Sequence, residues 1–387
     1  MTARIALPTP GGGTETLTLS EPAGWQRPAA PATSRIAYAA AHVVADPYAD
    51  NAPDAPARLD WDATLAVRRD LWSWGLGVAE AMDTAQRGMG LDWAATRELI
   101  RRSAAEAASC GGRIVAGAAT DQLTGVPDTL DDVATAYAEQ VAFVQECGAV
   151  AVVMASRHLA ALATGPDDYL RVYRRVLDAS DAPVVLHWLG DMFDPALAGY
   201  WGSTDLDDAT RTFVALVHAH ADVIDGVKVS LLDAVREVRL RELLPPTVRV
   251  YTGDDYHYPE LIAGDGVRSS DALLGAFAAV APAASAALQR LDAGDPAGFR
   301  AVLDPTVPLS RHVFAPPTRY YKTGIAFLSW LNGRQPGFTM VGGLHGGRGV
   351  PHLVETFRLA DAAGLLLDPE LAAERMRGYL AVAGVTR

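Results

Sequence analysis

Short apolar runs alternate with longer amphipathic segments along most of the chain. The runs fall at 36–43, 76–82, 113–117, 149–154, 183–188, 223–229, 247–251 and near 266–270. Runs of this length are typical of parallel strands that are buried on both faces. The segments between them have helical spacing; they include 61–74, 93–108, 131–147, 168–179, 207–221 and 230–244. Eight strands alternating with helices predict an α/β fold, most simply a closed (β/α)8 TIM barrel.

The two ends of the chain depart from this alternation. Residues 1–34 are rich in Gly, Pro and Thr, and two alternating segments flank Gly11-Gly12-Gly13, which predicts a short N-terminal β-hairpin. After the eighth strand, segments 271–291, 295–303, 319–332, 350–363 and 368–383 all have helical patterns. We therefore expect a hairpin extension over 1–34, a barrel over 35–300 and a C-terminal helical extension over 301–387.

Composition restricts the class of partner. The 387 residues carry a formal net charge of -13, which argues against nucleic acid or an anionic membrane surface as a partner. No run reaches the ~18 apolar residues that a membrane span needs, and no signal peptide is visible. The two cysteines form no CxxC motif, which is typical of a reduced compartment. We expect a cytoplasmic protein that acts on a small molecule.

One lysine stands inside an apolar strand. Lys228 lies in Val-Ile-Asp-Gly-Val-Lys-Val-Ser, the sixth predicted strand. Burial disfavours the ammonium form, and a neutral amine is the nucleophile that condenses with a ketone to a Schiff base. The structural alternative is a lysine at the strand end that is paired with a neighbouring aspartate.

Polar residues gather where the predicted strands end, which is the side of a barrel that carries active sites. His187 ends the fifth strand, next to the strand of Lys228, and its ordinary pKa suits proton transfer. The expected substrate-binding residues at these ends are Thr84, Gln86, Arg157, Asp191, Ser230, Gly253, Asp254 and Asp255. Two of these have structural alternatives: a surface ion pair for Arg157, and a turn closed by the Asp254–Asp255 pair.

Three segments resemble the dihydrodipicolinate synthase / N-acetylneuraminate lyase family of class I aldolases. They are 224–228 with Lys228, 251–255 followed by Gly264-Asp265-Gly266, and 182–187. The resemblance covers the chain from about Arg35 to the C-terminal helices. It implies a barrel with a helical extension, a Schiff-base lysine at Lys228, no cofactor, no metal, and assembly as a homodimer or homotetramer.

The chain also differs from that family at several positions. The family's proton-relaying tyrosine on the fifth strand corresponds to His187, and only Thr84 remains of its threonine pair. Ser156 and Arg157 stand where the synthases offer a tyrosine pair, and Met192 replaces an arginine. These differences argue against the lysine-biosynthesis reaction and indicate a divergent branch.

The resulting hypothesis is a Schiff-base lyase, an aldolase or a dehydratase, that acts through Lys228 and His187 on a 2-keto acid or a polyhydroxylated keto compound. Two alternatives remain open at this point. One is a metal-dependent barrel enzyme with His187, Asp191, Asp254 and His257 as ligands. The other is a barrel that binds a small molecule without catalysis.

Overall fold

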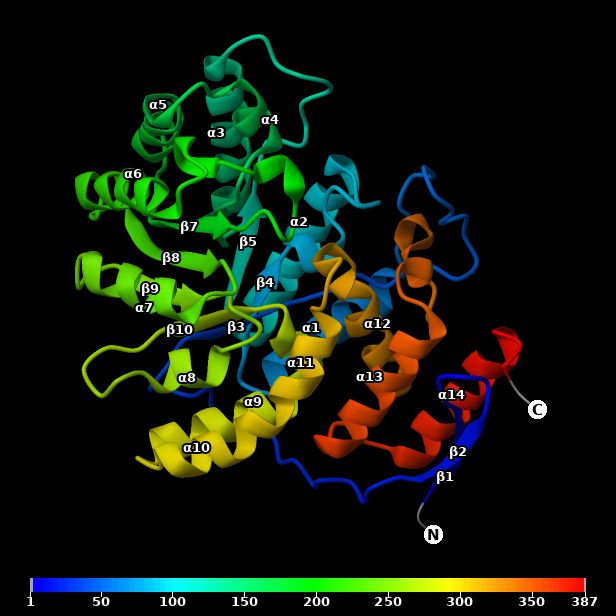
Figure 1. The fold of residues 1–387 in the computed structure, drawn as a ribbon. Helices are drawn as coiled ribbons and strands as arrows, with labels where there is room; N and C mark the ends of the chain where they lie inside the picture. Colours follow the sequence, from blue (N-terminus) through cyan, green and yellow to red (C-terminus); the bar gives the residue numbers. More distant parts are fainter. Residues whose placement is uncertain (1–2, 386–387) are drawn as a thin grey trace.

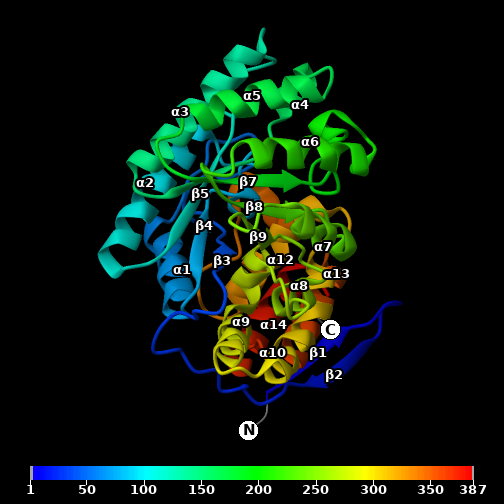
Figure 2. The ribbon, with the colours of Figure 1, turned by 90° about the vertical axis from the view of Figure 1, so that its left-hand side faces the viewer.

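The computed structural model describes residues 3–385, and eight parallel strands in it close into a barrel surrounded by helices (Figures 1 and 2). Each strand pairs with its neighbours in chain order, and the last closes against the first. The strands are β3 (Ala37–Ala40), β4 (Gly77–Glu80), β5 (Ile114–Ala118), β6 (Val150–Val153), β7 (Val184–Leu189), β8 (Ile224–Ser230), β9 (Arg249–Thr252) and β10 (Asp271–Leu274). The predicted (β/α)8 fold is confirmed.

Helices connect the strands and continue beyond the barrel. Local signals set their ends: Asp92 caps the start of α2, and a capping box between Thr129 and Asp132 starts α3. The helices around the barrel are α1 (Trp61–Ser73), α2 (Trp93–Cys110), α3 (Leu130–Glu146), α4 (Arg157–Leu162), α5 (Pro166–Asp178), α6 (Leu206–Ala219), α7 (Ala234–Leu243), α8 (Tyr258–Ala263) and α9 (Ala276–Asp292). The extension contains α10 (Pro296–Leu303), α11 (Val307–Val313), α12 (Tyr321–Leu331), α13 (Val350–Ala362) and α14 (Pro369–Val382).

The eighth strand lies later than the sequence pattern predicted. Residues 266–270 form a loop in which Asp265 accepts hydrogen bonds from the backbone of Val267 and Arg268. This turn keeps the segment out of the sheet, and β10 begins at Asp271. The prediction of one helix over 271–291 was therefore wrong in its first residues, because the apolar run Ala272 to Leu274 was merged with the alanine-rich helix α9.

The N-terminal hairpin is present and packs on the other end of the chain. Strands β1 (Arg4–Pro8) and β2 (Thr14–Thr18) pair antiparallel with Ile5 opposite Leu17. The backbone N–H of Ser20 donates to Asp361 in α13 at 2.9 Å, and the Trp25 indole donates to the Gly364 carbonyl at 2.8 Å. Figure 1 shows the hairpin (blue) beside α14 (red).

The C-terminal helices lie over the end of the barrel where the strands point (Figure 1). Two contacts join α12 to the loop that follows β4, which contains the short helix η1 (Asp83–Ala85): the Tyr321 and Thr84 hydroxyls are 2.8 Å apart, and Lys322 Nζ lies 3.2 Å from Met89 Sδ. A second short helix, η6 (Val341–Gly347), contacts the same loop through the Val341 carbonyl, which accepts a hydrogen bond from Gln86. The extension thus forms part of the wall above the barrel.

A buried ion pair anchors the start of this loop. Arg68 in α1 donates to both carboxylate oxygens of Glu80 at 2.8 Å, and both side chains are fully buried. Glu80 also accepts from the backbone N–H of Ala81, which has a positive φ of 51°. Glu80 and Arg68 therefore fix the turn that leads directly to Asp83.

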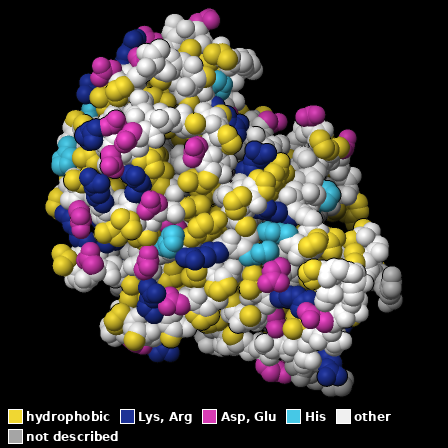
Figure 3. Space-filling model, in the orientation of Figure 1, with side chains coloured by type: hydrophobic (Ala, Val, Ile, Leu, Met, Phe, Trp, Pro, Cys, Tyr) yellow, Lys and Arg dark blue, Asp and Glu magenta, His cyan; other side chains and the backbone are white. Residues whose placement is uncertain are grey.

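Seen from outside, acidic, basic and apolar side chains are interspersed over the face drawn in Figure 3. No helix of the described residues combines the length and the apolar character that crossing a bilayer requires.

Candidate active site

Lys228 projects into the barrel interior near the carboxyl end of β8. In the sheet it stands opposite His187 of β7 and Tyr251 of β9. The residue is 7 % exposed, and among residues 3–385 its amine has neither a hydrogen bond nor an ion pair within 4 Å. A Cβ on Gly253 would lie 2.9 Å from Lys228 Cε and 2.2 Å from Ser230 Oγ, so only glycine fits against the lysine here.

The charge state of Lys228 is set by burial and by two aspartates. Burial lowers the pKa of its amine to about 8, against the opposing effect of the carboxylates of Asp83 and Asp255. Burial raises the pKa of Asp255 to about 7, although the backbone N–H of Ala276 donates to it at 2.8 Å. Both groups therefore change their protonation state close to neutral pH.

His187 lies beside this lysine but does not have the charge behaviour that the sequence predicted. It is completely buried, its Nε2 is 3.1 Å from Ser230 Oγ, and its Nδ1 has no partner among the described residues. Burial and the positive charge of Lys228 hold the pKa of His187 well below its usual range. The expectation of an unperturbed histidine pKa was wrong, because the ring is surrounded by the barrel interior.

The two aspartates after β9 face different ways. Asp254 accepts from the backbone N–H groups of Tyr256 and His257 and pairs with His257 Nδ1 at 2.9 Å. Its oxygens thus close a local turn, whereas Asp255 influences Lys228. The structure brings together only Asp254 and His257 of the four metal-ligand candidates, and no group of three or more His, Cys, Asp or Glu within 3–385 is placed to hold a metal ion.

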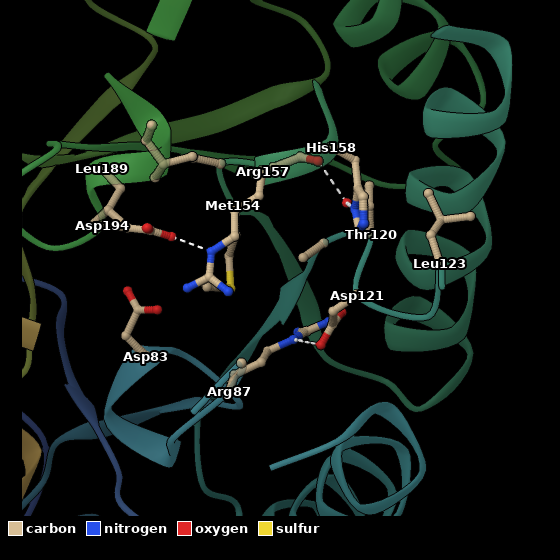
Figure 4. A pocket seen from close by; sticks show the side chains of 15 residues that line it. Asp83, Arg87, Thr120, Asp121, Leu123, Met154, Arg157, His158, Leu189 and Asp194 are labelled. Atoms are coloured by element: carbon tan, nitrogen blue, oxygen red, sulfur yellow. Dashed lines mark hydrogen bonds and ion pairs between the residues drawn. The ribbon is translucent and has the colours of Figure 1, made fainter. Parts of the chain in front are cut away.

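A cavity of ≈ 230 Å³ opens at the ends of β4 to β7 (Figure 4). Arg157 lines it and pairs with Asp194 at 2.5 Å, while Arg87 is held by Asp121. Lys228 is not among the lining residues. Asp83 connects the two features, because its carboxylate lines the cavity and its charge acts on Lys228.

The remaining predicted residues are spread around the mouth. Thr84 is buried against Tyr321. The side-chain amide of Gln86 donates to the Met89 and Val341 carbonyls, so Gln86 stabilises the loop and does not point at a substrate. Asp191 is exposed and lies along a separate cavity with Met192 and Tyr200. The structure therefore gathers Lys228, His187, Ser230, Gly253 and Asp255, with Thr84 nearby, and leaves Asp191 and Asp254 outside this group.

Three residues at the mouth were not predicted from sequence. Asp83 directly precedes Thr84 but was not singled out, and Tyr321 and Lys322 come from the C-terminal extension. One signal was available for Lys322: of the 33 basic side chains in the chain, only two are lysines, and both are buried at this end of the barrel. For Tyr321 the sequence offered no signal, because Thr84 is 237 residues away.

Known structures share this architecture. A putative dihydrodipicolinate synthetase from Pseudomonas aeruginosa aligns with 85 % of this chain and 99 % of its own at 16 % identity and a TM-score of 0.64. YagE from E. coli K12, of the dihydrodipicolinic acid synthase family and solved with pyruvate, covers 86 % of this chain and 99 % of its own, at 15 % identity and a TM-score of 0.67. The Aquifex aeolicus dihydrodipicolinate synthase gives 13 % identity and a TM-score of 0.64, over 86 % of this chain and 99 % of its own. At these identities the likeness establishes a shared fold, which confirms the resemblance seen in the sequence at that level.

A family model described as "Protein of unknown function (DUF993)" matches residues 5–385. The chain belongs to the DUF993 family. No curated protein has a significantly similar sequence. The DUF993 barrel is thus a distant relative in fold of the synthases, with its own set of residues around the lysine.

Proposed function

We propose that this DUF993 chain is a Schiff-base-forming lyase of the class I aldolase type that acts on a keto compound through Lys228. The observation that carries the proposal is a buried amine inside the barrel, without a hydrogen bond or ion pair among residues 3–385, at the end where barrel enzymes place their chemistry. Burial without a paired carboxylate favours the neutral amine, which is the form that attacks a carbonyl carbon.

In the proposed reaction, Lys228 Nζ adds to the ketone carbon of a 2-keto acid or polyhydroxylated ketone, and the carbonyl oxygen leaves as water. The resulting iminium accepts the electron pair of a breaking bond at the neighbouring carbon and becomes an enamine. The bond is C–C in an aldol cleavage and C–O in a dehydration. Protonation of the enamine and hydrolysis of the imine then release the product and the free amine.

We assign the proton transfers to Asp255, because its pKa of about 7 lets it give and take a proton near neutral pH. A neutral His187 positions the Ser230 hydroxyl, at 3.1 Å, beside the same lysine. Thr84, held by Tyr321, offers a hydroxyl to the substrate from the opposite loop. Asp254 and Asp191 have no part in this scheme.

Borohydride reduction tests the proposal directly. Wild-type protein incubated with a panel of 2-keto acids and ketoses and then reduced should gain the mass of the reduced substrate on the peptide that contains Lys228. Protein reduced without substrate is the control. Turnover of a substrate by protein that never becomes labelled at Lys228 would contradict the Schiff-base mechanism.

The rate of trapping should depend on pH as a bell with limbs near pH 7 and pH 8. Below the bell Lys228 is protonated and cannot attack, and above it Asp255 has lost the proton that it donates. Asp255→Asn should remove the descending limb. The limb that remains should then follow the Lys228 amine alone, whose pKa is raised by Asp83 and no longer by Asp255. A variant that keeps the wild-type bell would exclude Asp255 as the proton carrier.

A further inference from the structure

The second lysine of the chain, Lys322, contacts Met89 in the loop after β4, whose residues Arg87 and Gly88 line the cavity. Lys322 has no role in the mechanism above. It is the second residue of α12 and is 2 % exposed; its amine lies 3.2 Å from a thioether, Met89 Sδ, and 5.4 Å from the centre of the Tyr321 ring. A thioether is a weak acceptor, and an ammonium has three donors. Among residues 3–385, no carboxylate lies within 4 Å of this amine. A buried cation left this poorly satisfied is uncommon outside functional sites.

A second cation approaches the same short segment. A Cβ on Gly88 would lie 3.2 Å from Arg157 Nη1, so the guanidinium of Arg157 rests on the residue next to Met89. Burial lowers the pKa of Lys322 to about 8; Asp83 and Asp194 oppose this shift, and the positive charge of Arg157 adds to it. Arg157, Asp83 and Asp194 all line the cavity (Figure 4).

The charges around this end of the cavity do not balance within the protein. Arg157 is paired with Asp194 at 2.5 Å, whereas neither Lys322 nor Lys228 has an ion pair within 4 Å among residues 3–385. The carboxylate of Asp83 acts on both lysines from a longer distance, together with Asp194 on Lys322 and Asp255 on Lys228. An anion placed between Lys322 and Arg157 would accept hydrogen bonds from the Lys322 amine and would give the Arg157 guanidinium a second anionic partner. Met89, which contacts Lys322, is a flexible side chain between Gly88 and Gly90, which have positive φ values of 70° and 115°.

We propose that Lys322, with Arg157, binds an oxyanion of the substrate, so that the substrate is a keto compound with a carboxylate or phosphate group away from its carbonyl. Met89 is displaced when this group binds. The inference rests on the proposed function, because it places the reacting carbonyl at Lys228 and the anionic group of the same substrate at Lys322 and Arg157.

The first experiment compares matched pairs of probes in borohydride trapping at Lys228. Dihydroxyacetone phosphate is compared with dihydroxyacetone, and 2-oxoglutarate with pyruvate, to separate a phosphate from a distal carboxylate. In wild-type protein, the member that carries the distal phosphate or carboxylate should, in at least one pair, half-saturate trapping at a concentration about ten-fold lower than its partner. Lys322→Met should reduce this ratio to about one, and Lys322→Arg should restore part of it. A ratio unchanged in Lys322→Met would overturn the proposal.

A second experiment does not need the Schiff base. Inorganic phosphate or malonate, compared with chloride at equal ionic strength, should raise the Tm of wild-type protein by about 2 °C or more, because ligands that bind the folded state stabilise it. Lys228→Met should keep this rise and Lys322→Met should lose it. Absence of the rise in wild-type protein, or its persistence in Lys322→Met, would refute the anion site. If no probe labels Lys228 while the rise depends on Lys322, the lyase assignment fails and the anion site stands.

Discussion

Lys228→Met should lower turnover by about 10⁴-fold or more and abolish borohydride labelling, while the protein becomes more stable at neutral pH. Loss of the attacking amine removes the covalent route altogether. Stability should rise by about 1–3 kcal/mol, because the native state no longer has to keep an amine uncharged or bury its charge. The pKa of Lys228 is about 8 in the folded protein and about 10.5 in the unfolded chain, so the gain should be full below pH 8 and vanish as the pH rises toward 10.5.

Urea unfolding at pH 7 and pH 10 measures the stability change, and a steady-state assay on the trapped substrate measures turnover. Lys228→Arg is the matched control, since it keeps a cation of similar length that cannot form an imine at neutral pH. It should be as inactive as the methionine variant. An arginine variant that retains appreciable turnover would mean that Lys228 acts only through its charge.

Arg68→Met should destabilise the protein by about 3–5 kcal/mol, which is the largest stability effect expected for a single change in this region. The pair with Glu80 is completely buried, and removal of the arginine leaves a carboxylate without its partner in the protein interior. The same change should slow turnover, because Glu80 holds the turn at Ala81 that precedes Asp83. Urea unfolding with an unchanged m-value gives the free energy.

The neighbouring residue provides the comparison for this prediction. Arg69 pairs with Glu106 at the surface, where both side chains are partly exposed, and Arg69→Met should cost less than about 1 kcal/mol. The double variant Arg68→Met/Glu80→Gln should recover part of the lost stability, since it removes the unpaired charge. Equal effects of the Arg68 and Arg69 changes would mean that the buried pair does not fix the loop.

The barrel and its lysine could be predicted from sequence because both depend on local pattern. Each strand is a short apolar run, and Lys228 interrupts one of them, so its position near the strand end inside the barrel followed from alternation alone. The eighth strand was misplaced because only the turn closed by Asp265 separates the loop from the sheet. Hydrophobic periodicity does not report these backbone hydrogen bonds to Asp265, so it does not show where the loop ends and the strand begins.

The surroundings of the lysine could be predicted only in part. Asp254 and Asp255 are adjacent and chemically identical, and their different roles arise because one closes a turn while the other faces Lys228. The pKa of His187 depends on complete burial, which residue type does not report. Tyr321 and Lys322 reach the mouth through packing of the C-terminal helices, a contact between segments more than 200 residues apart.

The attachment of the hairpin to α13 has a consequence for biosynthesis. Asp361, which accepts a hydrogen bond from the Ser20 N–H, is 341 residues further along the chain. The hairpin therefore leaves the ribosome early but cannot pack against α13 until that helix has been synthesised. Until α13 and α14 have been synthesised, Ile5 and Leu7 lack the helices that cover them. Nascent chains halted before α13 should therefore display a protease-sensitive amino terminus, which becomes resistant once the final helices emerge.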